Sequence, residues 1–208
     1  MQRNDVIEFL GKIDDHLKKH CQSELQGQKF ELKIFGKSAL MLAGLQDSVG
    51  TVDIDLLRVD GQPTPESNAN IIKTLEAEFG QARMKTYGYF LQFVEPAVPF
   101  LPAEPNWVPL GIPYAHLSVT FLEPNHVAAS KLFSAFSTPP RKRDKQDIVA
   151  LLDQGLVDLK TICPIADKIF AWQDARSIIY PKVYAYLTEE LMKKHGKVKL
   201  MYCPDDQA

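Results

Sequence analysis

Two aspartates one residue apart, inside a run of β-branched and aliphatic residues, constrain this chain more than any other feature. The run is Thr51-Val52-Asp53-Ile54-Asp55-Leu56-Leu57. In a strand, residues i and i+2 project from the same face, so Asp53 and Asp55 are expected side by side, with Ile54 and Leu56 opposite. Adjacent carboxylates repel each other unless a cation lies between them, and Mg²⁺ is commonly held by one or two carboxylates plus substrate phosphates. The run therefore predicts a strand with a metal-binding face.

A turn upstream of this strand favours the metal site. Residues 30–35 alternate apolar and charged side chains, as a strand does, and a short helix rich in Ala, Leu and Met then follows through Leu45. Glycine lets the backbone approach a ligand, and helix N-termini bind phosphate through free N–H groups. We therefore expect the turn to contact nucleotide phosphates through Gly36, Lys37 and Ser38. Two plainer interpretations remain open: a solvent-facing edge strand for the aspartates, and a helix-capping hydroxyl for Ser38.

Helical and strand patterns alternate along the first 124 residues, and helical patterns follow. We predict helices over 4–22 and 67–79 and strands over 30–35, 51–59, 87–94 and 116–121, then helices over 125–136, 144–152 and from Leu156 onward. Proline recurs at every third or fourth position from Pro96 to Pro113, which excludes a regular central strand or helix there. The fold class is therefore α/β (α+β): a mixed β-sheet flanked by helices over 1–124, with a helical C-terminal region, 125–208, packed on it.

Composition excludes several classes of protein. Hydrophobic residues make up 45% of the chain and charged residues 24%, which is typical of a globular protein and not of a disordered one. No apolar run approaches the length of a membrane span, and residues 1–5 are too polar for a signal peptide, so we expect a cytoplasmic protein without a membrane partner. The net charge of −2 gives no global reason for tight, non-specific nucleic-acid binding.

The order of these motifs resembles the nucleotidyltransferase superfamily with the DNA polymerase β type of fold. The signature of that superfamily is a Gly-rich turn, a short helix and a strand with Asp-x-Asp. More narrowly, the chain is similar to bacterial nucleotidyltransferase-like proteins of the AbiEii toxin type. The narrower resemblance covers roughly residues 30–152 and rests on residues 35–40, 51–55, the Pro-rich 93–102, 122–124 with 129–132, and 143–148.

This resemblance implies a Mg²⁺- or Mn²⁺-dependent transfer of a nucleotidyl group from a nucleoside triphosphate to an RNA, protein or small-molecule acceptor. It implies that Asp53 and Asp55 are catalytic and bind the metal, and that a third carboxylate on the next strand completes the site. It also implies that a helix lysine, Lys131, faces the phosphates. If the toxin resemblance is functional, tRNA is a natural acceptor and an antitoxin is an expected partner.

The chain departs from the family pattern in three places. Lys37 stands where a second glycine is usual, and the gap from Lys37 to Asp53 is longer than the family shows. Gln92 occupies the position of the third carboxylate, for which Glu95 and Glu123 are the available substitutes. Glutamine offers a neutral carbonyl oxygen but no charge. The alternative function is therefore a catalytically degenerate member that serves as a nucleotide-binding or protein-interaction module.

Two residues of the helical region also have plainer interpretations. Lys131 equally suits a solvated lysine on the surface of a helix. Asp144, three residues before Asp147, is predicted to cap the N-terminus of the helix over 144–152 and to add a favourable charge in its first turn.

Overall fold

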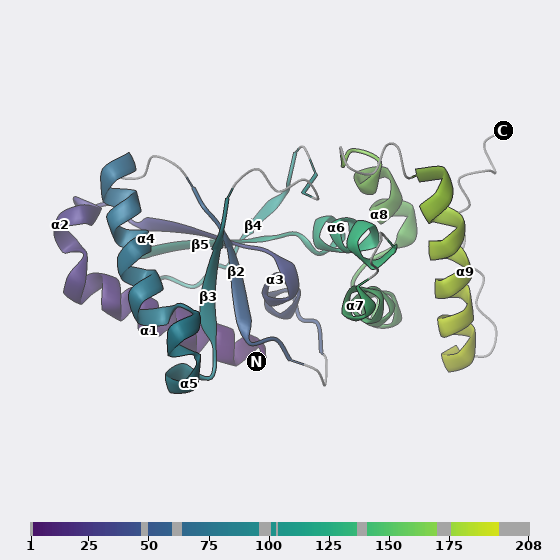
Figure 1. Cartoon of the computed structure of the whole chain (residues 1–208), viewed down its shortest axis with the longest axis horizontal. Coiled ribbons are helices and arrows are strands. Elements are labelled where there is room, and N and C mark those ends of the chain that lie inside the picture. Colours follow the sequence, from purple (N-terminus) through teal and green to yellow (C-terminus); the bar gives the residue numbers. More distant parts are fainter. Residues whose placement is uncertain are drawn as a thin grey trace. The chain divides into compact units, whose positions relative to one another are not determined.

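The fold is a five-stranded mixed β-sheet flanked by helices, followed by a helical region, which confirms the predicted α/β (α+β) class. The computed structural model describes residues 2–46, 50–59, 64–95, 101–102, 104–136, 141–169 and 176–195. The chain forms two units: Met1–Ala97 with Trp107–Leu122, which holds the sheet, and Val98–Asn106 with Glu123–Ala208, which holds the later helices (Figure 1). Within the described residues, no helix is both long and apolar enough to cross a bilayer.

The sheet places the aspartate-bearing strand in its interior. Its strands are β1 (Phe30–Ile34), β2 (Asp53–Leu57), β3 (Phe90–Val94), β4 (Trp107–Pro109) and β5 (Leu117–Leu122), in the order β3-β2-β1-β5-β4. Strand β1 is antiparallel to β2 and parallel to β5, whereas β2 is parallel to β3 and β4 is antiparallel to β5. Since β2 has a neighbour on each side, the edge-strand interpretation of the aspartates is wrong.

One face of the sheet is apolar because the strands alternate. Leu32 and Ile34 of β1 and Ile54 and Leu56 of β2 are buried, while the residues between them are only half-buried. Figure 1 shows α1 (Arg3–His20) and α4 (Pro65–Phe79) on one side of the sheet. These helices bury an apolar stripe, as their 3.6-residue periodicity predicts. Its members are Val6, Phe9, Leu10, Ile13 and Leu17 of α1, and Ile71, Ile72, Leu75 and Phe79 of α4.

Several boundaries differ from the prediction. The helix after the turn, α3, spans Gly36–Leu42 and so begins at the glycine itself. The predicted strand over 87–94 begins three residues late because α5 (Met84–Tyr87) precedes it. Short helical segments also follow α1 and α4, namely α2 (Gln22–Leu25) and η1 (Gln81–Arg83). The proline-rich segment contributes β4, three residues at the edge of the sheet, where a terminal proline removes no needed hydrogen bond.

The second unit is helical in its described part. Its helices are α6 (Pro124–Phe136), α7 (Lys142–Asp153), α8 (Leu159–Ala166) and α9 (Arg176–His195). The prediction that Asp144 caps α7 is wrong, because α7 begins two residues earlier and Arg141 is its N-cap residue. Asp144 lies in the first turn, as predicted, but its side chain is buried.

Candidate metal and nucleotide site

Asp53 and Asp55 project from the same face of β2. Both are half-buried, whereas Ile54 and Leu56 between and after them are fully buried on the opposite face. The Thr51 hydroxyl is hydrogen-bonded to the Asp53 carboxylate, which fixes that side chain at the start of the strand. The alternation predicted from the sequence therefore holds, and it sets two carboxylates side by side on the polar face of the sheet.

The Asp55 carboxylate lies against the turn that opens α3. Gly36 has a φ of +65°, and a Cβ atom built on it would lie 2.5 Å from Asp55 Oδ2. The backbone N–H of Phe35 also donates to the Asp55 carbonyl at 3.0 Å. Only glycine fits this position without a shift of the carboxylate, because a side chain would be strained by the backbone and would collide with an acid oxygen. The glycine turn and the Asp-x-Asp strand thus form one structural feature.

Ser38 is buried and is hydrogen-bonded to the strand that carries the aspartates. Its side chain is 1% exposed, and its hydroxyl donates to the backbone carbonyl of Asp53 at 2.8 Å. The single proton of this hydroxyl is therefore used inside the protein, and the predicted contact of Ser38 with nucleotide phosphate stays a prediction. The capping interpretation is wrong, since Phe35 is the N-cap residue of α3 and makes no side-chain cap bond. Ser38 instead fixes α3 to β2, and Lys37 beside it is half-buried.

The residue beside Asp55 on the next strand is Gln92. Strands β2 and β3 are parallel, with Asp55 paired to Gln92 and Asp53 to Phe90, so the exposed Gln92 shares the face of the aspartates. Glu95 is not on this face, because it lies beyond β3 and pairs with Arg58 at 2.6 Å. The third oxygen donor next to the carboxylate pair is consequently an amide.

Glu123, the other candidate for the third acid, lies at the start of α6 in the second unit, where its carboxylate already has hydrogen-bond partners. Its carboxylate accepts from the backbone N–H of Asn125 at 3.0 Å and is 3.0 Å from Nδ1 of His126. Burial alone would raise the pKa of Glu123, but the hydrogen bonds from His126 and Asn125 outweigh it and hold the pKa below its usual value. This carboxylate is committed to capping the N-terminus of α6.

The donor set of the polar face fits a hard divalent cation. Across the described ranges, no group of three or more His, Cys, Asp or Glu side chains gathers for a metal. Mg²⁺ does not need such a cage, because it retains waters and is held by one or two carboxylates together with phosphate oxygens. Asp53 and Asp55 provide the two carboxylates, and Gln92 provides a neutral oxygen beside them.

Lys131 lies in a buried ionic cluster of the second unit. Its Nζ is 2.5 Å from Asp144 Oδ1 and 2.8 Å from Asp147 Oδ2, and Ser134 donates to the other Asp144 oxygen at 2.6 Å. The interpretation of Lys131 as a solvated lysine is wrong, because its side chain is only 12% exposed. Burial alone would lower the pKa of Lys131, but the charges of Asp147 and Asp144 raise it overall. Its predicted contact with nucleotide phosphate stays a prediction.

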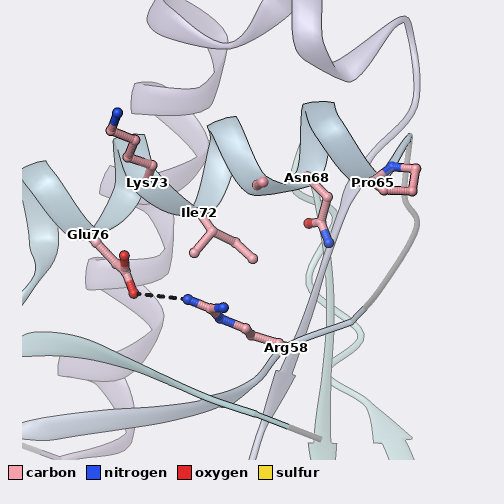
Figure 2. A pocket seen from close by; sticks show the side chains of 7 residues that line it. Arg58, Pro65, Asn68, Ile72, Lys73 and Glu76 are labelled. Carbon is pink, nitrogen blue, oxygen red and sulfur yellow. Dashed lines mark ion pairs between the residues drawn. The ribbon is translucent and has the colours of Figure 1, made fainter.

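A pocket of about 300 Å³ lies elsewhere on the first unit, between α4 and the end of β2 (Figure 2). It is lined by Arg58, Pro65, Asn68, Ala69, Ile72, Lys73 and Glu76. Arg58 follows Ile54 and Leu56 in the strand alternation, so it faces α4 and not the aspartate side. Its guanidinium is already paired with Glu76 at 3.7 Å (Figure 2) and with Glu95. No sequence motif indicates this pocket, because its walls come from separate elements.

Comparisons of the chain with protein-family models, with curated proteins and with solved structures found no match. Function is therefore inferred from the order of the sequence motifs and from the geometry of the polar face. In that geometry, residues far apart in the sequence, Gly36, Asp55 and Gln92, meet on adjacent elements.

Proposed function

We propose that the first unit binds a nucleoside triphosphate with Mg²⁺ or Mn²⁺ on the face that carries Asp53 and Asp55, and transfers a nucleotidyl group to an acceptor. The acceptor class is RNA, protein or a small molecule. The observation that carries this proposal is the packing of the Asp55 carboxylate against the Gly36 turn, 2.5 Å from where a Cβ would stand. Gly36 thereby brings the turn that opens α3 directly against a carboxylate of the Asp-x-Asp strand.

Some residues of the site would hold the metal ion, and others orient the side chains that hold it. Asp53 and Asp55 would hold the ion, which when bound would neutralise phosphate oxygens and align the triphosphate for in-line attack. The Thr51 hydroxyl orients the Asp53 carboxylate, and the Ser38 hydroxyl fixes β2 to α3 by donating to the backbone carbonyl of Asp53. Gly36 leaves room for the Asp55 carboxylate at the turn. Preorganised ligands of this kind spare the cost of ordering side chains when substrate binds.

A degenerate relative that binds nucleotide or a protein partner without catalysis is the second candidate. The observation that favours it is the pairing of Gln92 with Asp55, which puts an uncharged amide where the resemblance implies a third acid. A site with two carboxylates retains metal binding, but it holds more weakly the metal ions that neutralise the charge of the phosphates during transfer. If the toxin resemblance is functional, the acceptor belongs to translation and an antitoxin covers the protein in the cell.

Removing both aspartates should abolish nucleotide transfer. We expect the Asp53→Ala/Asp55→Ala variant to reduce transfer of label from each NTP to total RNA or cell extract to background, because both metal ligands are lost. The measurement is incubation with labelled NTP and Mg²⁺ or Mn²⁺, followed by separation of RNA, protein and small molecules. Asp15→Ala/Glu66→Ala is the matched control, because it removes two acids from exposed helix positions. Equal labelling by the wild-type protein and the Asp53→Ala/Asp55→Ala variant would sink the enzyme proposal.

Converting Gln92 to glutamate separates the two candidate functions. The variant should bind Mg²⁺ about 10-fold more tightly, because ligand charge sets the affinity of such oxygen sites. Calorimetry and the rise in thermal midpoint on adding Mg²⁺ measure this, with Gln28→Glu as an exposed control. An active enzyme should transfer label in both forms, whereas a degenerate protein should transfer only in the variant or in neither. Unchanged metal affinity would place Gln92 outside the site.

A further inference from the structure

We propose that Lys33 and Thr120 form the phosphate-binding half of the site, with Asp53 and Asp55 as its metal-binding half; this rests on the proposed function. The pairing of strands supports it first. Lys33 of β1 is paired with Leu57 of β2 across an antiparallel ladder, so it shares the face of Leu57 and Asp55. Lys33 and Asp55 are then diagonal neighbours on adjacent strands, at a separation that long side chains reach.

The ammonium of Lys33 is held by contacts that it can exchange. Its Nζ is 3.5 Å from Glu31 Oε1 and 5.7 Å from the centroid of the Trp107 ring, and the side chain is 27% exposed. A long ion pair and a partly solvated cation–π contact are weak interactions, so little is lost when the ammonium leaves them. Phosphate oxygens offer shorter, charge-assisted hydrogen bonds in exchange. Lys33 is therefore held on the polar face of the sheet, toward Trp107 of β4, without being fixed there.

Thr120 supplies the second observation that points to a ligand. It is the direct partner of Lys33 on the parallel strand β5, so its side chain lies on the same face. Its Oγ1 atom is buried and has no hydrogen-bond partner in the part of the chain that the structure describes. A buried hydroxyl without a partner is unfavourable, and a native structure rarely keeps one without a reason. A phosphate oxygen bound beside Lys33 would accept the proton of this hydroxyl once the atoms that cover Oγ1 move aside.

The charges of this face determine whether a polyphosphate binds with or without a metal ion. Among the described residues of this face and its turn, the three acids Glu31, Asp53 and Asp55 outnumber the two lysines Lys33 and Lys37, so a bare polyphosphate meets net repulsion. A divalent cation held by the aspartates reverses that balance. The site therefore takes a polyphosphate together with its metal ion and binds the metal-free anion poorly. The ligand class is the triphosphate chain itself, whatever base it carries.

The test uses inorganic triphosphate, with and without Mg²⁺, and the full chain in a Trp172→Phe background, where Trp107 is the remaining tryptophan. We expect calorimetric binding only with Mg²⁺, and a change in Trp107 emission as Lys33 leaves the ring. Lys33→Met should weaken binding about 10- to 100-fold, and Thr120→Val about 3- to 10-fold. Lys12→Met is the matched control, because it also breaks a surface Lys–Glu pair, with Glu8 at 3.0 Å, and should bind normally.

Each outcome assigns the failure to one proposal. If Asp53→Ala/Asp55→Ala abolishes binding but Lys33→Met binds like the wild type, the phosphate-binding half is wrong and the metal site stands. If the wild type binds no Mg²⁺–triphosphate, or the double aspartate variant binds it unchanged, the proposed function itself fails. Thr120→Val should also keep or raise the thermal midpoint, because it removes an unpaired hydroxyl. A lower midpoint would show that this hydroxyl has a structural partner and would overturn its assignment.

Discussion

A Lys131→Met variant is expected to unfold with a free energy about 3–5 kcal/mol lower than that of the wild type, because it leaves two buried carboxylates without their cation. Asp144 and Asp147 both contact the Lys131 ammonium, at 2.5 and 2.8 Å, on the facing surfaces of α6 and α7. The methylene stem is replaced by a side chain of similar size, so packing is retained. Urea denaturation followed by circular dichroism gives the change.

The chain offers a control with the same chemistry on an exposed surface. Lys193 of α9 also bridges two carboxylates, Glu189 at 2.8 Å and Glu190 at 2.9 Å, but its side chain is 60% exposed. Lys193→Met should leave the unfolding midpoint nearly unchanged, because solvent screens exposed pairs and replaces their partners. If the Lys193 and Lys131 variants lost equal stability, burial would not be the source of the effect.

The same cluster predicts how stability depends on pH. Burial is the largest influence on Lys131 and lowers its pKa, but Asp147 and Asp144 together raise it above the ordinary 10.5. A raised pKa in the folded state contributes stability that is fully present below pH 10.5 and is lost as pH rises through the folded-state value. The difference in unfolding free energy between wild type and Lys131→Met should therefore shrink above pH 10.5. A difference that stayed constant through that range would contradict the ionic origin.

Gly36→Ala is expected to lower the free energy of unfolding by about 2–4 kcal/mol and to impair the metal site at the same time. Part of the cost, about 1–2 kcal/mol, comes from placing a Cβ at a left-handed backbone position. The rest comes from the collision with Asp55 Oδ2, 2.5 Å away, which must rotate out of place. Chemical denaturation gives the stability, and Mg²⁺ titration should show weaker binding.

Two comparisons isolate the contact between Gly36 and Asp55. Gly27 has a similar φ of +79° with nothing within 4 Å of the added atom, so Gly27→Ala should show the backbone cost alone. In an Asp55→Ala background, Gly36→Ala should lose its additional cost, because the colliding oxygen is gone. If the two substitutions were additive, the turn and the carboxylate would not be coupled.

The sequence predicts what depends on local periodicity. The apolar spacing of α1 and α4 and the alternation around Asp53 and Asp55 each arise within a single element, and the structure has them as expected. The residue beside Asp55 could also be anticipated, because Gln92 occupies a middle position in the next strand pattern. These features need only the geometry of one helix or strand and its neighbour.

The sequence does not predict side-chain roles that depend on distant partners. Asp144 has the local signature of a helix cap, but its partner Lys131 lies on another helix, thirteen positions earlier. Ser38 follows a glycine turn in the manner of a phosphate ligand or cap, yet its acceptor is the carbonyl of Asp53, which only the packing of α3 on β2 supplies. Strand β4 likewise depends on its backbone pairing with β5, and its three residues are too few to show the alternation of apolar and polar side chains that predicts a strand.

The parallel pairing of β1 with β5 has a consequence for the order in which the chain folds. It pairs Phe30 with Leu117, so the intervening chain must first close into a loop. The conformational entropy lost in that closure is offset only when the contacts between β1 and β5 form. The antiparallel pair of β1 and β2 spans a much shorter loop, through α3. On a ribosome, the Gly36 turn and the Asp-bearing strand can therefore meet early, while the sheet stays open until β5 emerges and docks against β1. The carboxylate face is assembled first, and completion of the sheet comes last.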